Sequence, residues 1–433
     1  MVPPVGHPRA TVDRGGDALT PGNRPAPVAI DDLAAPRFPD EVLPIREAMA
    51  EMGAAIALEP DVLLAAAVEQ AGVDDFGDTG FRERLDVLCE AFSKDVTLSV
   101  SGRAAMFVQL TELLRNRLMI NDVLRRHPEI DELDVKAPII ICGLPRTGTT
   151  HLHNLLSADP ALRSLPYWES VQPVLPQGAP DERVAATQAA LDVVNTALPY
   201  FKRMHEMTPD EVHEEINLLA MDVSSMFFET MAAMPTWRDY YLNTDQTPAY
   251  AYLKRVLKVL QFLRGGERWV LKSPQHLEQF GPLSTVFPDA TFVVTHRDPV
   301  AVTKSLTTMM TYLARLNLET VDPRVVGGYW ADRLETMLRA CVRDRDLLPA
   351  ERSIDVRFNE FMADDVDMVE RIYAIAGQPF TPEVRASMEK FMQTHPRGRH
   401  GGVIYNLNEF GLDEAERRQA LQFYVDRFDI ELE

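Results

Sequence analysis

Apolar residues first follow a helical pattern in the stretch between residues 45 and 134. Leu63, Ala67 and Ala71 fall on one helical face, and a glycine-bounded loop over residues 72–80 interrupts the pattern. We therefore predict a helical N-terminal region over residues 45–134 that packs on the rest of the chain. Such a region either covers a site or mediates self-association into a homo-oligomer.

Residues 1–44 carry no such pattern. They contain nine prolines, which neither a helix interior nor a central strand accommodates. We predict that this stretch is an extended or disordered arm. It lacks the apolar centre of a secretion signal, which predicts a cytoplasmic protein.

Short β-branched runs alternate with helical segments from residue 135 onward, and this alternation is typical of parallel strands joined by crossover helices. The predicted strands are Ile139–Cys142, Trp269–Leu271, Phe292–Thr295 and Ile354–Val356. The predicted fold class is α/β, with three layers around a central parallel sheet over residues 135–433. A mostly helical insertion at about residues 165–265 separates the first two predicted strands, and such an insertion commonly builds an acceptor pocket.

The charge of the chain limits its partners. The formal net charge is −21, from 65 acidic against 44 basic residues, which disfavours binding to nucleic acid or to anionic lipid surfaces. Any anionic ligand must therefore be held by a local cluster of cations.

No apolar run approaches the roughly 18 residues that a membrane-spanning helix needs, so we predict no transmembrane segment. The three cysteines are too few for a disulfide framework and are predicted to be buried thiols.

The segment after the first predicted strand has the features of an anion site. Residues 143–148 form a glycine-bounded loop that leads into a helix, which gathers free backbone N–H groups and the positive end of a helix dipole. The glycine spacing is that of a nucleotide-binding P-loop. However, Thr149 stands where a P-loop carries lysine, and no later strand ends in an aspartate suited to Mg²⁺. The core is therefore P-loop-like, without the residues of triphosphate chemistry.

Residues 145–150, with the sequence Pro-Arg-Thr-Gly-Thr-Thr, resemble the 5′-phosphosulfate loop of sulfotransferases. The resemblance implies that the cofactor is the sulfuryl donor 3′-phosphoadenosine-5′-phosphosulfate (PAPS), that the chemistry needs no metal, and that the fold is a single α/β domain. It also implies a donor-binding role for five residues of the loop, which are Arg146, Thr147, Gly148, Thr149 and Thr150.

Two further segments resemble donor-binding motifs of the same family. Arg297 closes a predicted strand and Ser305 follows eight residues later, which matches the family's 3′-phosphate site. Near the C-terminus, residues 395–402 concentrate cations and glycines and resemble the loop that closes over the nucleotide. This resemblance implies phosphate contacts for Arg397 and Arg399.

Sulfuryl transfer to a hydroxyl requires cations that face the charge developing on the leaving oxygen. Lys272 follows a buried strand at the sheet edge where α/β proteins hold their ligands. It resembles the strand-end lysine of sulfotransferases, which implies that Lys272 stabilises the leaving group. Arg146 is expected to share the sulfuryl and 5′-phosphate oxygens, so both residues are candidate catalytic residues.

The general base is less well defined by the sequence. Cytosolic sulfotransferases typically carry a histidine two residues after the strand-end lysine, but this chain has Pro274 there. Tyrosylprotein sulfotransferases use a glutamate about twenty residues after the loop arginine, and Glu169 stands at nearly that distance, so it is the preferred candidate. Four alternatives remain, which are His276, Glu211, His213 and Glu214.

These features together predict transfer of a sulfuryl group from PAPS to a hydroxyl of a small-molecule or lipid-like acceptor. Two other functions remain open, a P-loop kinase or other phosphotransferase and a non-catalytic nucleotide-binding scaffold. A Met/Phe-rich stretch at residues 221–234 either lines an apolar acceptor pocket or belongs to the core, and helical spacing favours the core.

Overall fold

A single parallel sheet forms the centre of the protein. The computed structural model describes residues 24–433, so most of the predicted arm, residues 1–23, lies outside the described residues. The sheet has five strands in the order β2-β3-β1-β4-β5, and all neighbours are parallel. The strands are β1 (Ile139–Cys142), β2 (Leu162–Arg163), β3 (Arg268–Ser273), β4 (Thr291–His296) and β5 (Ser353–Arg357). All four predicted strands are therefore present, and only the two-residue β2 was not predicted.

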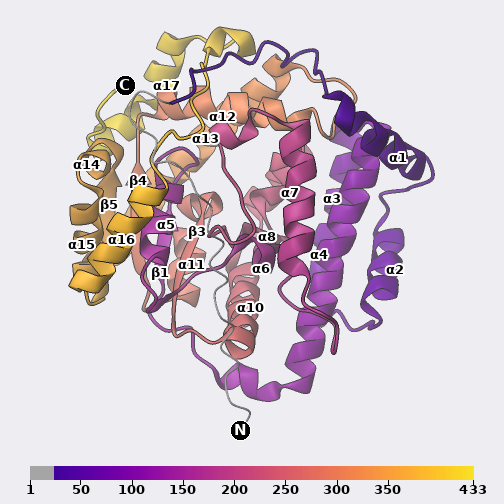
Figure 1. Cartoon of the computed structure of the whole chain (residues 1–433), viewed down its shortest axis with the longest axis horizontal. Helices are drawn as coiled ribbons and strands as arrows, with labels where there is room; N and C mark the ends of the chain where they lie inside the picture. Colours follow the sequence, from indigo (N-terminus) through magenta and orange to yellow (C-terminus); the bar gives the residue numbers. More distant parts are fainter. Residues whose placement is uncertain (1–23) are drawn as a thin grey trace.

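Helices cover both faces of the sheet (Figure 1). Because side chains alternate along a strand, Ile139 and Ile141 face one layer and Ile140 and Cys142 face the other. The first layer contains α5 (Thr149–Ser157), α14 (Phe358–Ala363), α15 (Asp365–Ala376) and α16 (Pro382–Thr394). The second contains α10 (Thr247–Arg264), α11 (Phe280–Val286), α12 (Pro299–Ala314), α13 (Pro323–Asp344) and α17 (Glu414–Phe428). The predicted three-layer α/β architecture is confirmed.

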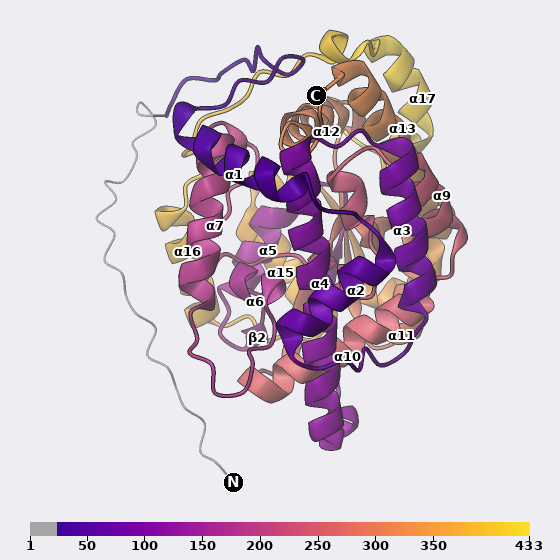
Figure 2. The ribbon, with the colours of Figure 1, turned by 90° about the vertical axis from the view of Figure 1, so that its right-hand side faces the viewer.

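The N-terminal part of the chain is helical from Leu43 onward and lies at one side of the sheet domain (Figure 2). Its helices are α1 (Leu43–Gly53), α2 (Pro60–Ala71), α3 (Phe81–Asp95) and α4 (Val100–Arg126). The long α4 packs against α1 and α2 on one side and against α10 on the other. On α4, Arg117 forms a buried ion pair of 2.6 Å with Asp222 of the insertion. This region therefore shares a continuous core with the α/β part.

Short helices build the insertion between β2 and β3. They are α6 (Tyr167–Val171), α7 (Arg183–Ala197), α8 (Ile216–Ala220) and α9 (Pro235–Asn243), and α10 completes the segment. The Met/Phe-rich stretch is buried here, with Phe228 packed edge-to-face on Trp237 at 5.3 Å. These residues belong to the core.

Within residues 24–433 no helix is long and apolar enough to cross a membrane. The three cysteines are buried thiols.

A buried charge cluster joins α13 to the insertion, through Glu229, and to the segment that follows β3, through Glu278. The guanidinium of Arg333, which is 0% exposed, donates to Glu278 over 2.6 and 2.7 Å and to Glu229 over 2.9 and 3.0 Å. Tyr329 donates its hydroxyl to Glu229 over 2.6 Å. Since Glu278 lies just after β3, this cluster fixes the chain that leaves the end of the strand.

We predict that Arg333→Met lowers the free energy of unfolding by about 3–5 kcal/mol, because two buried carboxylates lose their cation. Urea denaturation followed by circular dichroism measures this quantity. Arg343→Met is the matched control on the same helix, since Arg343 pairs with Asp344 at the surface. The control should change the stability by no more than about 1 kcal/mol. Equal losses in the two variants would contradict the assignment.

Candidate active site

The register of the sheet brings the predicted motifs to one edge. Cys142, the last residue of β1, lies opposite Ser273 of β3 and Val294 of β4. The loop that follows β1 therefore lies between the end of β3, which carries Lys272, and the end of β4, which precedes Arg297. In open parallel sheets this carboxyl edge is where ligands bind.

The loop of residues 143–148 is held tightly against β4. A side chain on Gly143 would place its Cβ 1.9 Å from the Thr295 hydroxyl, so only glycine fits. The Thr147 hydroxyl donates to the Leu144 carbonyl over 2.7 Å and contacts the Thr295 hydroxyl at 2.7 Å. Arg146 has a φ of 73°, a conformation that is strained for a residue with a side chain. Such strain is typical of functional loops.

The two predicted phosphate motifs are in direct contact. Arg146 donates its Nε to the Ser305 hydroxyl over 3.0 Å and also donates to the Met204 carbonyl. Arg297 donates its Nη1 to the Arg146 carbonyl over 2.7 Å. The structure thus brings together Arg146, Arg297 and Ser305.

Lys272 is buried at the end of β3, and two consecutive glutamates hold it. Its backbone N–H donates to Glu215 over 2.8 Å, and its ammonium donates to Glu214. Glu215 also contacts the His276 ring, whose other nitrogen lies 2.8 Å from the Tyr250 hydroxyl. Burial acts to raise the pKa of Glu215, but the contact with His276 and the Lys272 N–H lower it, so the carboxylate stays ionised. This network fixes the backbone beneath the Lys272 side chain.

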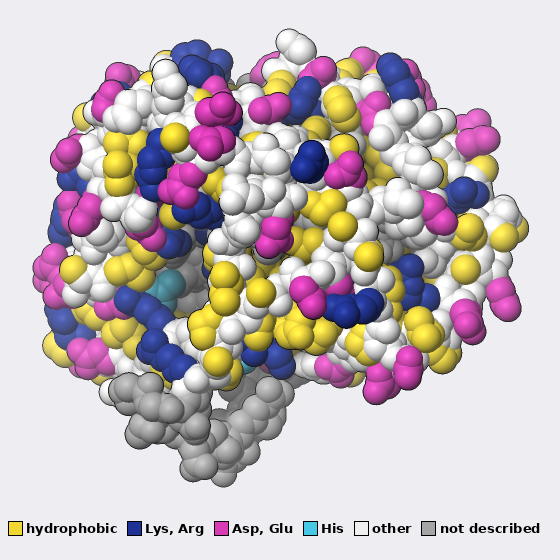
Figure 3. Space-filling model, turned by 90° about the horizontal axis from the view of Figure 1, so that it is seen from above, with side chains coloured by type: hydrophobic (Ala, Val, Ile, Leu, Met, Phe, Trp, Pro, Cys, Tyr) yellow, Lys and Arg dark blue, Asp and Glu magenta, His cyan; other side chains and the backbone are white. Residues whose placement is uncertain are grey.

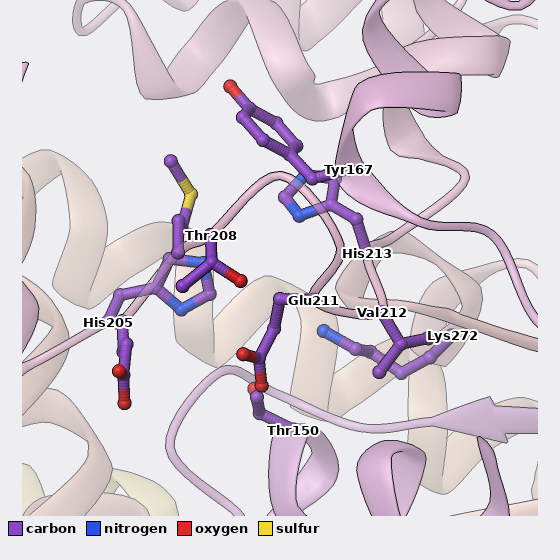
Figure 4. A pocket seen from close by; sticks show the side chains of 10 residues that line it. Thr150, Tyr167, His205, Thr208, Glu211, Val212, His213 and Lys272 are labelled. Carbon is purple, nitrogen blue, oxygen red and sulfur yellow. The ribbon is translucent and has the colours of Figure 1, made fainter. Parts of the chain in front are cut away.

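A small pocket opens beside Lys272, and Figure 4 shows the Lys272 ammonium and the Glu211 carboxylate pointing into it. Burial lowers the pKa of His205 to about 3, helped by the positive charges of Lys272 and Arg146. Burial also lowers the pKa of His213 well below its ordinary value. Both imidazoles are neutral near neutral pH. The pocket is lined by Thr150, Tyr167, His205, Glu206, Met207, Thr208, Glu211, Val212, His213 and Lys272.

The candidate bases occupy different surroundings. Burial raises the pKa of Glu211, and the nearby Glu206 carboxylate raises it further. By contrast, Glu169 is fully buried and pairs with Arg163 at 2.6 Å and with Arg264 at 3.0 Å, away from the pocket lining. Glu211 and His213 therefore line the pocket, Glu214 contacts Lys272, and Glu169 and His276 lie outside the pocket.

The late Arg/Gly loop lies beside the site, and its cations are paired. Arg399 and His400 both contact Glu206, at 2.5 and 2.9 Å. Arg397 pairs with Asp365 of α15. The face seen in Figure 3 has a hollow bordered by Lys and Arg side chains, with a histidine inside it.

Residues of the N-terminal arm hold this loop in place (Figure 2). Val28 donates its N–H to the Gly402 carbonyl over 3.1 Å, and Ile404 donates to the Val28 carbonyl over 2.8 Å. Arg203 donates to the carbonyls of Ala26 and Gly402, at 2.8 and 3.3 Å. The first described residues therefore lie side by side with the Arg/Gly loop.

Four of the five predicted donor cations are paired with carboxylates of the chain. Lys272 contacts Glu214, and the three outer arginines, Arg297, Arg397 and Arg399, contact Glu433, Asp365 and Glu206. Asp365 and Glu433, the partners of Arg397 and Arg297, are residues of the candidate site that the sequence motifs do not indicate. The signal that could have indicated them is the excess of acidic residues, because clustered cations in such a chain attract local carboxylates.

Among residues 24–433 no group of three or more His, Cys, Asp or Glu side chains is arranged to hold a metal ion.

Comparison with known proteins identifies the family. The sequence model described as the sulfotransferase family matches residues 138–382, and the chain therefore belongs to this family. The chain is 25% identical over 256 residues to omega-hydroxy-beta-dihydromenaquinone-9 sulfotransferase Stf3 of Mycobacterium bovis and of Mycobacterium tuberculosis (strain CDC 1551 / Oshkosh). This match covers 55% of the chain and 62% of each relative.

Two crystal structures share most of the fold. Sulfotransferase STF9 from Mycobacterium avium is 29% identical with a TM-score of 0.79, and the match covers 88% of this chain and 98% of STF9. Sulfotransferase STF1 from Mycobacterium tuberculosis H37Rv is 28% identical with a TM-score of 0.73, and the match covers 83% of this chain and 97% of STF1. The similarity to these two structures therefore extends beyond residues 138–382, the part of the chain that the family model matches.

We predict that Gly143→Ala lowers the free energy of unfolding by about 1–3 kcal/mol, because the new methyl group overlaps the Thr295 hydroxyl. Chemical denaturation measures the change. The double variant Gly143→Ala/Thr295→Ala removes the overlapping oxygen and should regain part of the loss. If the double variant loses the sum of the two single effects, the close approach does not explain the glycine.

Proposed function

We propose that this sulfotransferase transfers the sulfuryl group of PAPS to a hydroxyl of a lipid-like acceptor. The observation that carries the proposal is the contact between the two anion motifs. Arg146 of the loop touches Ser305, and Arg297 touches the Arg146 backbone, although about 150 residues separate the segments. A ligand with phosphate groups at both ends of an adenosine fits such a paired site.

The roles of the donor-binding residues follow from their positions. The backbone N–H groups of residues 147–150 and the start of α5 receive the 5′-phosphosulfate, as a helix N-terminus receives anions. Arg146 binds its oxygens, and Arg297 with Ser305 binds the 3′-phosphate. Arg397 and Arg399 close over the nucleotide from the loop that the N-terminal arm holds.

The chemistry is an in-line displacement at sulfur. The acceptor oxygen forms a bond to sulfur while the bond from sulfur to the bridging phosphate oxygen breaks, and Lys272 faces the charge that develops on that oxygen. The acceptor gives up its proton to a base. We assign this role to Glu211, because its carboxylate lies in the pocket and its raised pKa makes it a stronger base than an ordinary glutamate.

The lipid-like nature of the acceptor rests on the relatives named above. Stf3 is named for a hydroxylated menaquinone, which combines an apolar body with a hydroxyl. The pocket beside Lys272 includes Met207, Val212 and the ring of Tyr167, which packs on His213 at 4.5 Å. Neutral imidazoles and apolar side chains favour an uncharged acceptor over an acidic one.

We predict that adenosine 3′,5′-bisphosphate raises the melting temperature without Mg²⁺, because the proposed site offers the guanidinium groups of Arg146 and Arg297 and the N-terminus of α5 to its phosphates. At 100 times Kd the stabilisation should be about 2.7 kcal/mol. A thermal-shift titration with the bisphosphate, 5′-AMP and Mg²⁺-ATP tests this. In Arg297→Ala the bisphosphate should stabilise no more than 5′-AMP does. Stabilisation by Mg²⁺-ATP alone would contradict the proposal.

We predict that Glu211→Gln lowers kcat/KM by roughly 10²–10⁴-fold, because the acceptor loses its base. In the unsubstituted enzyme, kcat/KM should rise with pH through the raised pKa of Glu211, above the ordinary value of 4.5, and fall away below it. A radiolabelled sulfate-transfer assay over a pH series measures both.

Glu169→Gln is the control for this prediction. It should lose stability, since Arg163 and Arg264 lose their buried partner, but keep the acid limb of the pH profile in the fraction that folds. The reverse result, with the acid limb lost in Glu169→Gln and kept in Glu211→Gln, would make Glu169 the base.

A further inference from the structure

The guanidinium of Arg297 is held by the loop through Nη1 only, so its Nε/Nη2 edge can bind a second partner. Its Nη1 donates to the Arg146 carbonyl over 2.7 Å, and its plane lies over the Phe358 ring at 4.0 Å. The remaining donors, Nε and Nη2, form a fork that points away from the loop. A planar fork of this kind matches two oxygens of a phosphate or a carboxylate.

A carboxylate of the chain lies on this fork. Glu433 accepts from Nε over 2.5 Å and from Nη2 over 2.7 Å. Its backbone is anchored as well, because its N–H donates to Asp298 over 2.9 Å and its carbonyl accepts from Arg418 over 2.9 Å. Residues 430–433 form one wall of the pocket in which Arg297 lies.

We propose that Glu433 is an internal competitor for the 3′-phosphate and determines how strongly the enzyme prefers 3′-phosphorylated nucleotides. The inference rests on the proposed function, in which Arg297 binds the 3′-phosphate. The fork of Arg297 has room for one pair of oxygens. The 3′-phosphate must therefore displace the Glu433 carboxylate before it can take the bidentate position.

A phosphate group can displace the Glu433 carboxylate from Arg297. Both side chains are partly exposed, 22% for Arg297 and 41% for Glu433, so solvent screens their ion pair. A phosphate group carries close to two negative charges at neutral pH, against one for the carboxylate. The competitor weakens the binding of the donor and of the 3′,5′-bisphosphate product alike, because both carry a 3′-phosphate. A nucleotide without a 3′-phosphate leaves the Arg297–Glu433 pair in place and is unaffected.

The test compares two nucleotides in matched variants by isothermal titration calorimetry. In Glu433→Gln, adenosine 3′,5′-bisphosphate should bind about twofold to fivefold more tightly, as expected for removal of a partly exposed ion pair. Binding of 5′-AMP should not change. Glu431→Gln removes one charge from the same pocket, where Glu431 contacts Asn359 instead of an arginine, and should change neither affinity.

A double-variant cycle with Arg297→Ala completes the design. In that background Glu433→Gln should give no gain, because the fork is absent. Unchanged or weaker bisphosphate binding by Glu433→Gln, or an equal gain for 5′-AMP, would overturn the competitor role. If the unsubstituted protein does not bind the bisphosphate at all, the proposed function itself fails, and the two failures are thereby distinguished.

Discussion

The parallel hydrogen-bond register of β1 with β3 and β4 is the constraint on which the site depends. It aligns the last residue of β1 with Ser273, the last residue of β3, and with Val294, two residues before the end of β4. The loop after β1, the Lys272 ammonium and the Arg297 guanidinium then share one edge of the sheet. Displacing a strand by one residue would turn Lys272 to the opposite face, because side chains alternate along a strand.

Electrostatic balance is the second organising feature. A chain with a formal charge of −21 builds a cluster of cations and neutralises it with its own carboxylates, including Glu214, Glu206 and Asp365. The cations are therefore positioned before any ligand arrives. Under the proposed function, the phosphates of the donor exchange with these carboxylates, and the exchange requires only side chains to move.

Much of this arrangement could be predicted from sequence, because it rests on local signals. Buried strands are continuous β-branched runs, and the loop and Arg297 are contiguous motifs whose meeting follows from parallel strand order. The partners of the cations could not be predicted. The packing of α17 brings Glu433 to Arg297, and the packing of α15 brings Asp365 to Arg397. No local sequence pattern indicates such long-range pairs. The same holds for Glu169, whose pairing with Arg163 and Arg264 depends on how the insertion folds.

The parallel bridge between Val28 and Val403 bears on how the protein is made. It joins segments near opposite ends of the chain, so forming it closes a very long loop, and contacts of this kind form late in folding. During synthesis Val28 leaves the ribosome well before Val403 does. The Arg/Gly loop therefore gains its contact with the arm only after both Val28 and Val403 have left the ribosome.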